Sequence, residues 1–180
     1  MTDDTALLSA LGAIQARGAI GEASLHLAIA HAEQFVAALP PWVQRVADLG
    51  SGGGLPGLVI AVRRPTLAIS LVERRRSRAD LLSRAIRALG IADRVTVFAD
   101  DVRRFADLHP RAFDAVTARS FAAPSITAKW AGALLRIDGI LVVSEPPADD
   151  VDRWPPELLA SFGLRDQGRE QGVRRFLRAD

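Results

Sequence analysis

The chain has 180 residues, of which 49% are apolar and 24% are charged, with a formal net charge of +2 and no cysteine. Such a composition is typical of a soluble globular protein with room for one domain, and the lack of cysteine excludes disulfides, thiolate metal sites and cysteine nucleophiles. We expect a cytoplasmic protein, because the acidic start MTDD does not resemble a signal peptide and no apolar run approaches the ~20 residues of a membrane span.

The first expected segment is helical. Residues 1–45 contain a turn signal at RGAIGE, residues 17–22, and the pair Pro40-Pro41 ends the last helical pattern before the first strand. We treat this N-terminal helical segment as part of one domain that covers residues 1–180.

From Val46 onward, β-branched apolar runs alternate with helical patterns. Strands are expected at 46–49, 67–73, 95–98, 113–118 and 139–145, and helices at about 56–63, 77–89 and 124–135. This alternation predicts an α/β fold, with a mostly parallel sheet and helices on both faces, over residues 46–145. Residues 146–180 are expected to form a loop, a short helix and a last strand, which would suit a methyltransferase sheet if it ran antiparallel.

The stretch VADLGSGGGLPG, residues 46–57, places five glycines directly after the first strand. Two interpretations fit it. Gly52-x-Gly54-x-x-Gly57 matches the dinucleotide fingerprint, and Asp48-x-Gly50-x-Gly52-x-Gly54 matches the loop of S-adenosylmethionine enzymes. In both, glycine tolerates positive φ and lacks the Cβ that would block a ligand.

The neighbours of this loop favour S-adenosylmethionine. Glu73 ends the second strand, where either cofactor needs a carboxylate for its ribose hydroxyls. Pro56 has no N–H for a diphosphate, and Asp48 would repel one but attract an ammonium or a sulfonium. The candidate cofactor contacts in the loop are therefore Asp48, Gly50, Ser51 and Gly52.

Two aspartates, Asp100 and Asp101, follow the third strand. In a methyltransferase of this fold, that position commonly contacts the adenine. An aspartate there can equally cap the next helix, and one residue could do each job.

The strings DLGSGGGLPG, LVERRRSRADLL and FDAVTARSFA, within residues 46–143, resemble the bacterial 16S ribosomal RNA guanine-N7 methyltransferases, the glucose-inhibited division protein B family. The Leu-Pro-Gly after the glycines is the most specific piece. The resemblance implies a Rossmann-like class I methyltransferase fold, S-adenosyl-L-methionine as cofactor and 16S ribosomal RNA or the small ribosomal subunit as partner. The cofactor contacts that it implies are Gly50, Leu55, Glu73, Val102, Arg103 and Arg119.

The implied reaction moves a methyl group to guanine N7. This nitrogen already has a free lone pair, so orientation rather than a general base would supply the catalysis. Arg119 is the candidate catalytic residue, because its planar fork could hold the cofactor carboxylate or a substrate oxygen. Phe121, two residues on, is the one aromatic positioned to stack on a base or on the adenine.

If the resemblance holds, the chain is expected to be a divergent member of that family with a short N-terminal region. Asp101 stands where the family usually has a second arginine, and Ser144-Glu145-Pro146 occupies the place where a lysine commonly follows the last core strand. His31 aligns with the histidine of an upstream Arg-His-x-x-Asp-Ser signature, but the other named positions hold Ala30, Gln34 and Phe35.

These departures leave alternatives open: a small-molecule methyltransferase of the same fold, a non-catalytic cofactor-binding module and, last, a dinucleotide-dependent oxidoreductase. No metal site is expected, because His26, His31 and His109 lack metal-ligand spacing. The pI of 10.2 and the arginines at 74–76, 78, 84 and 87 permit contacts with RNA phosphates, although a solvated helix face explains them equally well. The sequence gives no indication of the oligomeric state.

Overall fold

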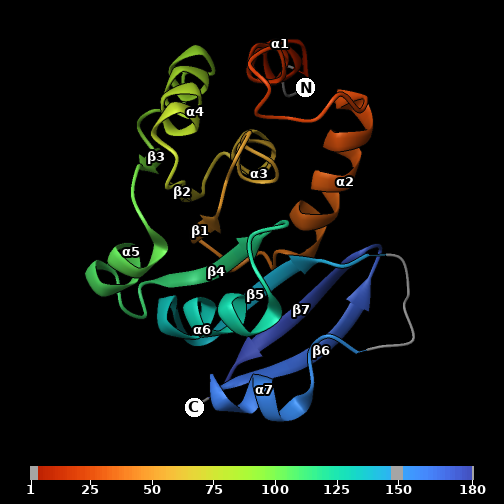
Figure 1. The fold of residues 1–180 in the computed structure, drawn as a ribbon, viewed down its shortest axis with the longest axis vertical. Helices are drawn as coiled ribbons and strands as arrows, with labels where there is room; N and C mark the ends of the chain where they lie inside the picture. Colours follow the sequence, from red (N-terminus) through yellow and green to blue (C-terminus); the bar gives the residue numbers. More distant parts are fainter. Residues whose placement is uncertain (1–3, 147–151, 180) are drawn as a thin grey trace.

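A computed structural model describes residues 4–146 and 152–179, which contain one seven-stranded sheet in the order β3-β2-β1-β4-β5-β7-β6 (Figure 1). The first five strands run parallel, and β7 lies antiparallel to both β5 and β6. The strands are β1 (Arg45–Leu49), β2 (Ala68–Val72), β3 (Val95–Phe98), β4 (Phe113–Ala118), β5 (Leu135–Ser144), β6 (Leu164–Glu170) and β7 (Val173–Arg178).

Helices lie on both faces of this sheet, as the sequence predicts. In Figure 1, α1 to α4 lie on one side of the strands and α5 to α7 on the other. The helices are α1 (Asp4–Gln15), α2 (Leu25–Ala38), α3 (Gly57–Arg63), α4 (Arg76–Ala88), α5 (Val102–Leu108), α6 (Pro124–Leu134) and α7 (Pro156–Ser161).

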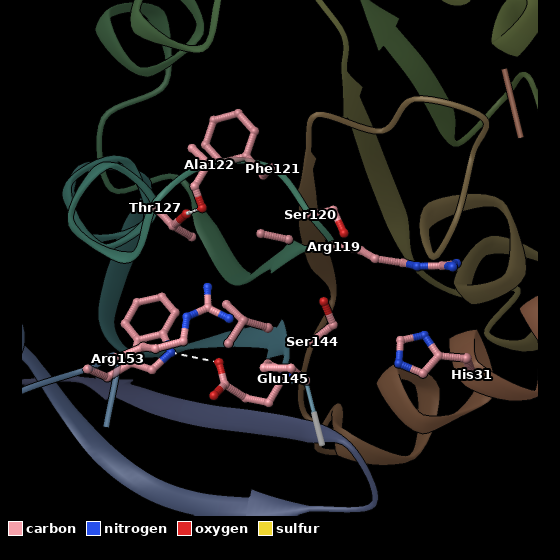
Figure 2. A pocket seen from close by; sticks show the side chains of 13 residues that line it. His31, Arg119, Ser120, Phe121, Ala122, Thr127, Ser144, Glu145 and Arg153 are labelled. Carbon is pink, nitrogen blue, oxygen red and sulfur yellow. Dashed lines mark hydrogen bonds between the residues drawn. The ribbon is translucent and has the colours of Figure 1, made fainter. Parts of the chain in front are cut away.

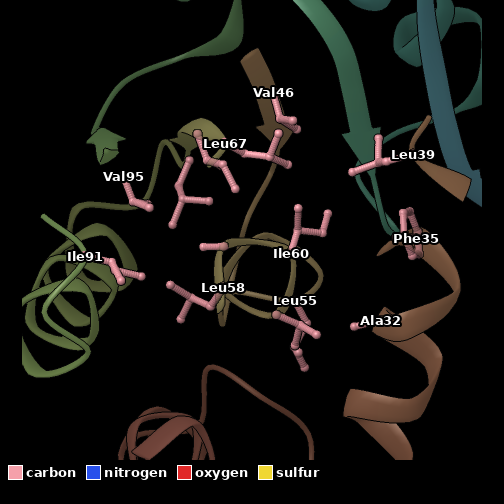
Figure 3. Packing of buried hydrophobic residues seen from close by; sticks show 14 of the residues in the cluster. Ala32, Phe35, Leu39, Val46, Leu55, Leu58, Ile60, Leu67, Ile91 and Val95 are labelled. Atoms are coloured by element: carbon pink, nitrogen blue, oxygen red, sulfur yellow. The ribbon is translucent and has the colours of Figure 1, made fainter. Parts of the chain in front are cut away.

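Each face of the sheet has its own hydrophobic core, because alternate residues of the buried strands point to opposite sides. Val46 of β1 belongs to the cluster under α1 to α4, and Ala47, the next residue, belongs to the cluster under α5 to α7. Figure 3 shows the first cluster, in which Leu58 and Ile60 of α3 lie between α4 and Phe35 of α2.

The N-terminal helices are tied to α3 by charge as well as by packing. Arg63, at the end of α3, forms ion pairs of 2.6 Å with Asp4 of α1 and with Glu33 of α2. The turn expected near residues 17–22 separates α1 from α2, and α2 ends two residues before Pro40. Residues 4–38 therefore contain two helices with a turn between them.

The expected helices and strands of the core are confirmed with shifts of one or two residues at most ends, but two predictions were incomplete. β5 begins at Leu135 rather than at 139. Residues 164–170 form the additional strand β6, which the sequence did not predict because LRDQGRE has no apolar alternation. β6 is an edge strand that pairs only with β7, so its side chains need not be apolar. Part of the expected loop, residues 147–151, lies outside the described residues.

Replacing Phe35 by Ala tests how far the N-terminal region supports the core. The Phe35 side chain is 0% exposed in the cluster of Figure 3, so its removal should lower the free energy of unfolding by about 3 to 5 kcal/mol in urea titrations. Leu27→Ala is the matched control, because Leu27 lies on the same helix and is 70% exposed. Equal losses in the two variants would contradict the packing described.

Candidate functional site

A cavity of about 420 Å³ opens at the carboxyl ends of β1, β2 and β3. The order of the sheet reverses beside β1, where β2 and β4 lie on either side of it, and ligands of open α/β sheets bind at such a switch point. The residues that line this first cavity include Gly50, Glu73, Arg74, Arg75, Arg78, Asp101, Val102 and Phe121.

Gly50 is the one residue of the glycine loop that lines the first cavity. Its φ is +64°, and a Cβ at this position would stand 2.7 Å from the Phe121 ring. Glycine is required here for both reasons. The side chain of Phe121 therefore lies against the loop from the cavity side.

Gly53 and Gly57 make room for the chain's own packing, so the missing Cβ at these two positions is explained without a ligand. A Cβ on Gly53 would stand 2.8 Å from the Ala19 carbonyl oxygen, and one on Gly57 would stand 2.4 Å from the Leu71 side chain. Gly53 thus lets the α1–α2 connection pass over the loop, and Gly57 lets α3 approach β2.

Glu73 holds the glycine loop in place. Its Oε2 accepts a hydrogen bond from the Gly52 amide at 2.9 Å, and its Oε1 accepts one from the Arg75 amide at 2.8 Å. The residue is only 5% exposed, yet it lines the first cavity. Each carboxylate oxygen keeps a lone pair after one bond, so Glu73 can still accept hydrogen bonds from a ligand.

Asp48 lies beneath the loop rather than in the cavity. It is 1% exposed, and its Oδ1 accepts a hydrogen bond of 2.7 Å from Thr117, its register partner on β4. Its buried Oδ2 makes no hydrogen bond of ordinary geometry, although the Gly57 amide lies close enough to favour its charge. Burial raises the pKa of Asp48 to about 6, against the opposing effects of Thr117, Ser51, Gly57 and Arg119.

The residues after β3 form a helix cap at the edge of the first cavity. Asp101 is the N-cap of α5, and its side chain accepts a hydrogen bond from the Arg103 amide at 2.8 Å. Asp100 instead pairs with Arg104 at 2.9 Å. Both aspartates line the cavity, as does the buried Val102, so capping and ligand contact are compatible at Asp101.

A second cavity, of about 330 Å³, lies at the carboxyl ends of β4 and β5 (Figure 2). Arg119 leaves the end of β4 and extends toward His31 of α2 on the same wall. Burial lowers the pKa of Arg119, and the Asp48 carboxylate acts in the opposite direction. Burial and the charge of Arg119 lower the pKa of His31, whose buried Nδ1 has no hydrogen-bond partner. Arg119 is thus a half-buried cation with no ion pair in the described part of the chain.

The opposite wall of the second cavity carries an anchored carboxylate. Glu145 follows β5, and its Oε1 accepts a hydrogen bond of 2.7 Å from the Trp154 indole (Figure 2). Trp154 is buried against Phe176 of β7, with their ring centroids 4.7 Å apart. The sequence did not predict the contact between Trp154 and Glu145. This contact depends on the position of β7 in the sheet, which no sequence motif indicates.

The two cavities share one wall, the segment Ser120-Phe121-Ala122. This segment separates Arg119 from Glu73, so the structure divides the predicted site residues into groups. Gly50, Glu73, Asp101 and Val102 line the first cavity, and Arg119 lines the second. Five others line neither cavity: Asp48, Ser51, Gly52, Leu55 and Arg103.

Those five residues are not equivalent. Gly52 contributes through its amide to Glu73, and the Ser51 hydroxyl donates to the Asp48 carbonyl at 2.9 Å. Leu55 packs in the first core, as Figure 3 shows, and Arg103 is exposed on α5. Direct side-chain contact with a ligand in this arrangement is therefore not supported for Leu55.

Within residues 4–146 and 152–179, no group of three or more His, Asp or Glu side chains is placed to hold a metal ion. In the same residues, no helix is both long enough and apolar enough to cross a membrane.

The family model for GidB, rRNA small subunit methyltransferase G, matches residues 27–146, which hold both the glycine loop and Arg119. The chain belongs to this family. Named relatives include the Ribosomal RNA small subunit methyltransferase G of Mycobacterium avium, 36% identical over 123 residues, which are 65% of this chain and 48% of that protein. The same enzyme of Rhizorhabdus wittichii is 47% identical over 78 residues, 43% of this chain and 35% of that protein. The chain spans about half the length of the curated relatives it matches.

Solved structures support the fold. The cofactor-bound Rv0187 from MTB superposes with a TM-score of 0.69 at 21% identity, covering 99% of this chain and 92% of that one. An O-methyltransferase family protein from Burkholderia thailandensis gives a TM-score of 0.66 at 17% identity, covering 87% of this chain and 56% of that one. The predicted class I methyltransferase fold is confirmed.

The buried charge of Asp48 gives stability a defined pH dependence. Because the pKa of about 6 in the folded protein exceeds the ordinary 3.8, the stabilisation present below about pH 4 is lost as the pH rises through 6. This difference in pKa between the folded and the unfolded protein corresponds to a change in the free energy of unfolding on the order of 3 kcal/mol. Urea titrations from pH 4 to pH 7.5 should show the free energy of unfolding of Asp48→Asn rising relative to the natural protein by up to that amount.

A constant offset between Asp48→Asn and the natural protein is also expected, since the amide is a different hydrogen-bonding group, and it does not bear on the test. A difference that stays constant over this pH range would contradict the raised pKa.

Proposed function

We propose that the protein is an S-adenosylmethionine-dependent methyltransferase that methylates guanine N7 in 16S ribosomal RNA. The observation that carries the proposal is the pair of cavities that meet at Ser120-Phe121-Ala122. The family match covers the whole lining of the first cavity and the lining of the second apart from Arg153 and Trp154. One cavity suits the methyl donor and the other the acceptor. A ribosomal RNA substrate implies a cytoplasmic location.

The first cavity fits S-adenosyl-L-methionine in size and chemistry. Its volume of about 420 Å³ lies within the usual range for cofactor sites. Glu73 would accept hydrogen bonds from the ribose hydroxyls, Asp101 and Val102 would lie beside the adenine, and Gly50 admits the cofactor against the turn. When bound, the cofactor would supply an electrophilic methyl group.

Asp48 would act through the electric field rather than by contact. At pH 7.5 its carboxylate is mostly ionised, because this pH lies above its pKa of about 6. A negative charge buried under the glycine loop favours a positively charged ligand above it, and low local polarity strengthens the effect. The same charge opposes the diphosphate of a dinucleotide.

The chain's own residues would mainly orient the acceptor. Guanine N7 needs no general base, so the site requires a fixed acceptor and exclusion of water rather than a proton-accepting group. Arg119 would hold the cofactor carboxylate or a substrate oxygen through its planar fork. Phe121, which lines both cavities, would supply an apolar face to an acceptor base.

A small molecule is the second candidate acceptor. Glu145 and Asp101 stand at the edges of the two cavities, where the family resemblance leads one to expect cations. Two fewer positive charges weaken phosphate contacts beside the site. This observation favours a substrate without a phosphate backbone and sets the design of the acceptor experiment.

Cofactor binding should depend on Glu73. In thermal-shift titrations, S-adenosylhomocysteine at 100 times its Kd should stabilise the natural protein by roughly 2.7 kcal/mol, whereas NAD should give no shift. Glu73→Gln should weaken S-adenosylhomocysteine binding at least tenfold, because it loses one acceptor oxygen and its charge. Glu157→Gln is the control, since Glu157 is exposed on α7 and lines neither cavity. Equal affinity in the two variants would argue against Glu73 as a cofactor ligand.

The acceptor is identified by methyl transfer from labelled S-adenosylmethionine to three materials: small ribosomal subunits, free 16S ribosomal RNA and a metabolite extract. We expect label at guanine N7 of the RNA and loss of that label in Arg119→Gln. Label in small molecules alone would replace the RNA proposal with the second candidate. Cofactor binding without any labelled product would contradict both and indicate a binding module.

A further inference from the structure

We infer that a basic hollow beside the first cavity, formed by Arg17, Arg78 and Arg84, binds phosphates of the RNA backbone. This inference rests on the proposed function, because it treats RNA as the partner. It adds a docking site next to the reaction site, and Arg78 lines both this hollow and the first cavity.

The hollow has a volume of about 400 Å³ and lies between the α1–α2 connection and α4. Arg17 comes from the connection, and Arg78 and Arg84 come from α4, which also contributes Ser77 and Asp80 to the lining. Three guanidinium groups and one carboxylate leave an excess positive charge at one place on a chain whose formal net charge is only +2. Such a local excess attracts polyanions.

The three arginines are available for a ligand. In residues 4–146 and 152–179 none of them forms an ion pair, whereas Arg63 and Arg174 each pair with two carboxylates. Asp80 also lines the hollow without an ion pair to its neighbours. These guanidinium groups therefore keep the N–H donors that a bidentate phosphate contact uses.

The hollow is fixed to the glycine loop. Arg78 lines both the hollow and the first cavity, and its Nη1 lies 3.8 Å from where a Cβ on Gly52 would stand. The connection that carries Arg17 passes directly over Gly53, whose missing Cβ would lie 2.8 Å from the Ala19 carbonyl oxygen. A phosphate held here would have a defined position relative to both cavities.

An RNA backbone fits this arrangement better than an isolated anion. Arg74 and Arg75 line the first cavity next to Arg78, so positive charge continues from the hollow along the cavity edge. Successive phosphates of one strand could follow that line, while an acceptor base reaches the second cavity. Contacts of this kind provide affinity that depends on salt and not on sequence.

The salt dependence of RNA binding tests the inference directly. A fluorescein-labelled RNA hairpin is titrated with the protein at several NaCl concentrations, and the slope of log Kd against log salt is measured. Each phosphate contact contributes about 0.7 to 0.9 to this slope, so Arg17→Gln/Arg84→Gln should reduce it by about 1.5. Asp80→Asn should instead lower the Kd for the RNA by about threefold, because it removes a negative charge from the path of the phosphates.

Arg111→Gln/Arg165→Gln is the control, because it removes the same charge from two exposed residues outside the hollow. Its slope should stay within about 0.3 of the natural value, since distant charges are screened. Equal loss in both double variants, or no tighter binding by Asp80→Asn, would overturn the inference. If Arg17→Gln/Arg84→Gln lost binding to phosphatidylglycerol vesicles but bound RNA as the natural protein does, the inference would be overturned in favour of a membrane surface.

Failure of the proposed function has a different signature. RNA binding by the hollow is measured without S-adenosylmethionine, so it does not require turnover. A protein that shows the expected slopes but labels no RNA would retain the docking site and contradict the methyltransferase proposal. A protein that labels guanine N7 with unchanged slopes would retain the enzyme and contradict the docking site.

Discussion

The site depends on the Glu73 carboxylate, which accepts hydrogen bonds from the Gly52 and Arg75 amides at once. The bond from Gly52 joins the turn after β1 to the turn after β2, and the bond from Arg75 lies within the turn after β2. A carboxylate buried to this extent is costly unless it is satisfied by donors. Here the donors are backbone amides of the site itself, so the shape of the first cavity depends on the position of the Glu73 carboxylate.

Asp48 provides the second constraint, on the other side of the same turn. Its Oδ1 is fixed by Thr117 across the β1–β4 pair, and its Oδ2 lies against Gly57 at the start of α3. The loop is thus held between two acids, one exposed to the cavity and one sealed beneath it. The buried acid costs stability at neutral pH, as its raised pKa indicates. A buried carboxylate that lowers stability beneath the glycine loop is consistent with a site that binds a cation.

Local patterns were sufficient to predict the fold wherever burial on both faces enforced them. The alternation of VADL, LAISLVE and GILVVSE with amphipathic segments specified parallel strands, and Gly90 marked the end of α4. β6 could not be predicted in this way, because an edge strand with solvent-facing residues needs no apolar pattern. The early start of β5 had the same cause, since Arg136, Ile137 and Asp138 are exposed.

The sequence could indicate the place of a residue that directly follows a strand. Gly50 follows β1 and Glu73 follows β2, and both line the first cavity. Gly53 and Gly57 instead accommodate the chain's own Ala19 and Leu71, which the sequence did not predict. Such contacts join segments distant in sequence, and a motif cannot distinguish them from contacts with a ligand.

The second cavity follows from tertiary structure alone, and this has a consequence for how the two cavities work together. His31, Arg119, Glu145 and Trp154 come from α2, the end of β4, the end of β5 and the segment before α7. Only the antiparallel placement of β7 beside β5 brings Trp154 to Glu145, since Phe176 packs against the indole. The wall that this cavity shares with the first includes Phe121, whose ring lies on Gly50. Any ligand that displaces that ring from one cavity therefore changes the wall of the other, so ligands in the two cavities would affect each other through Phe121.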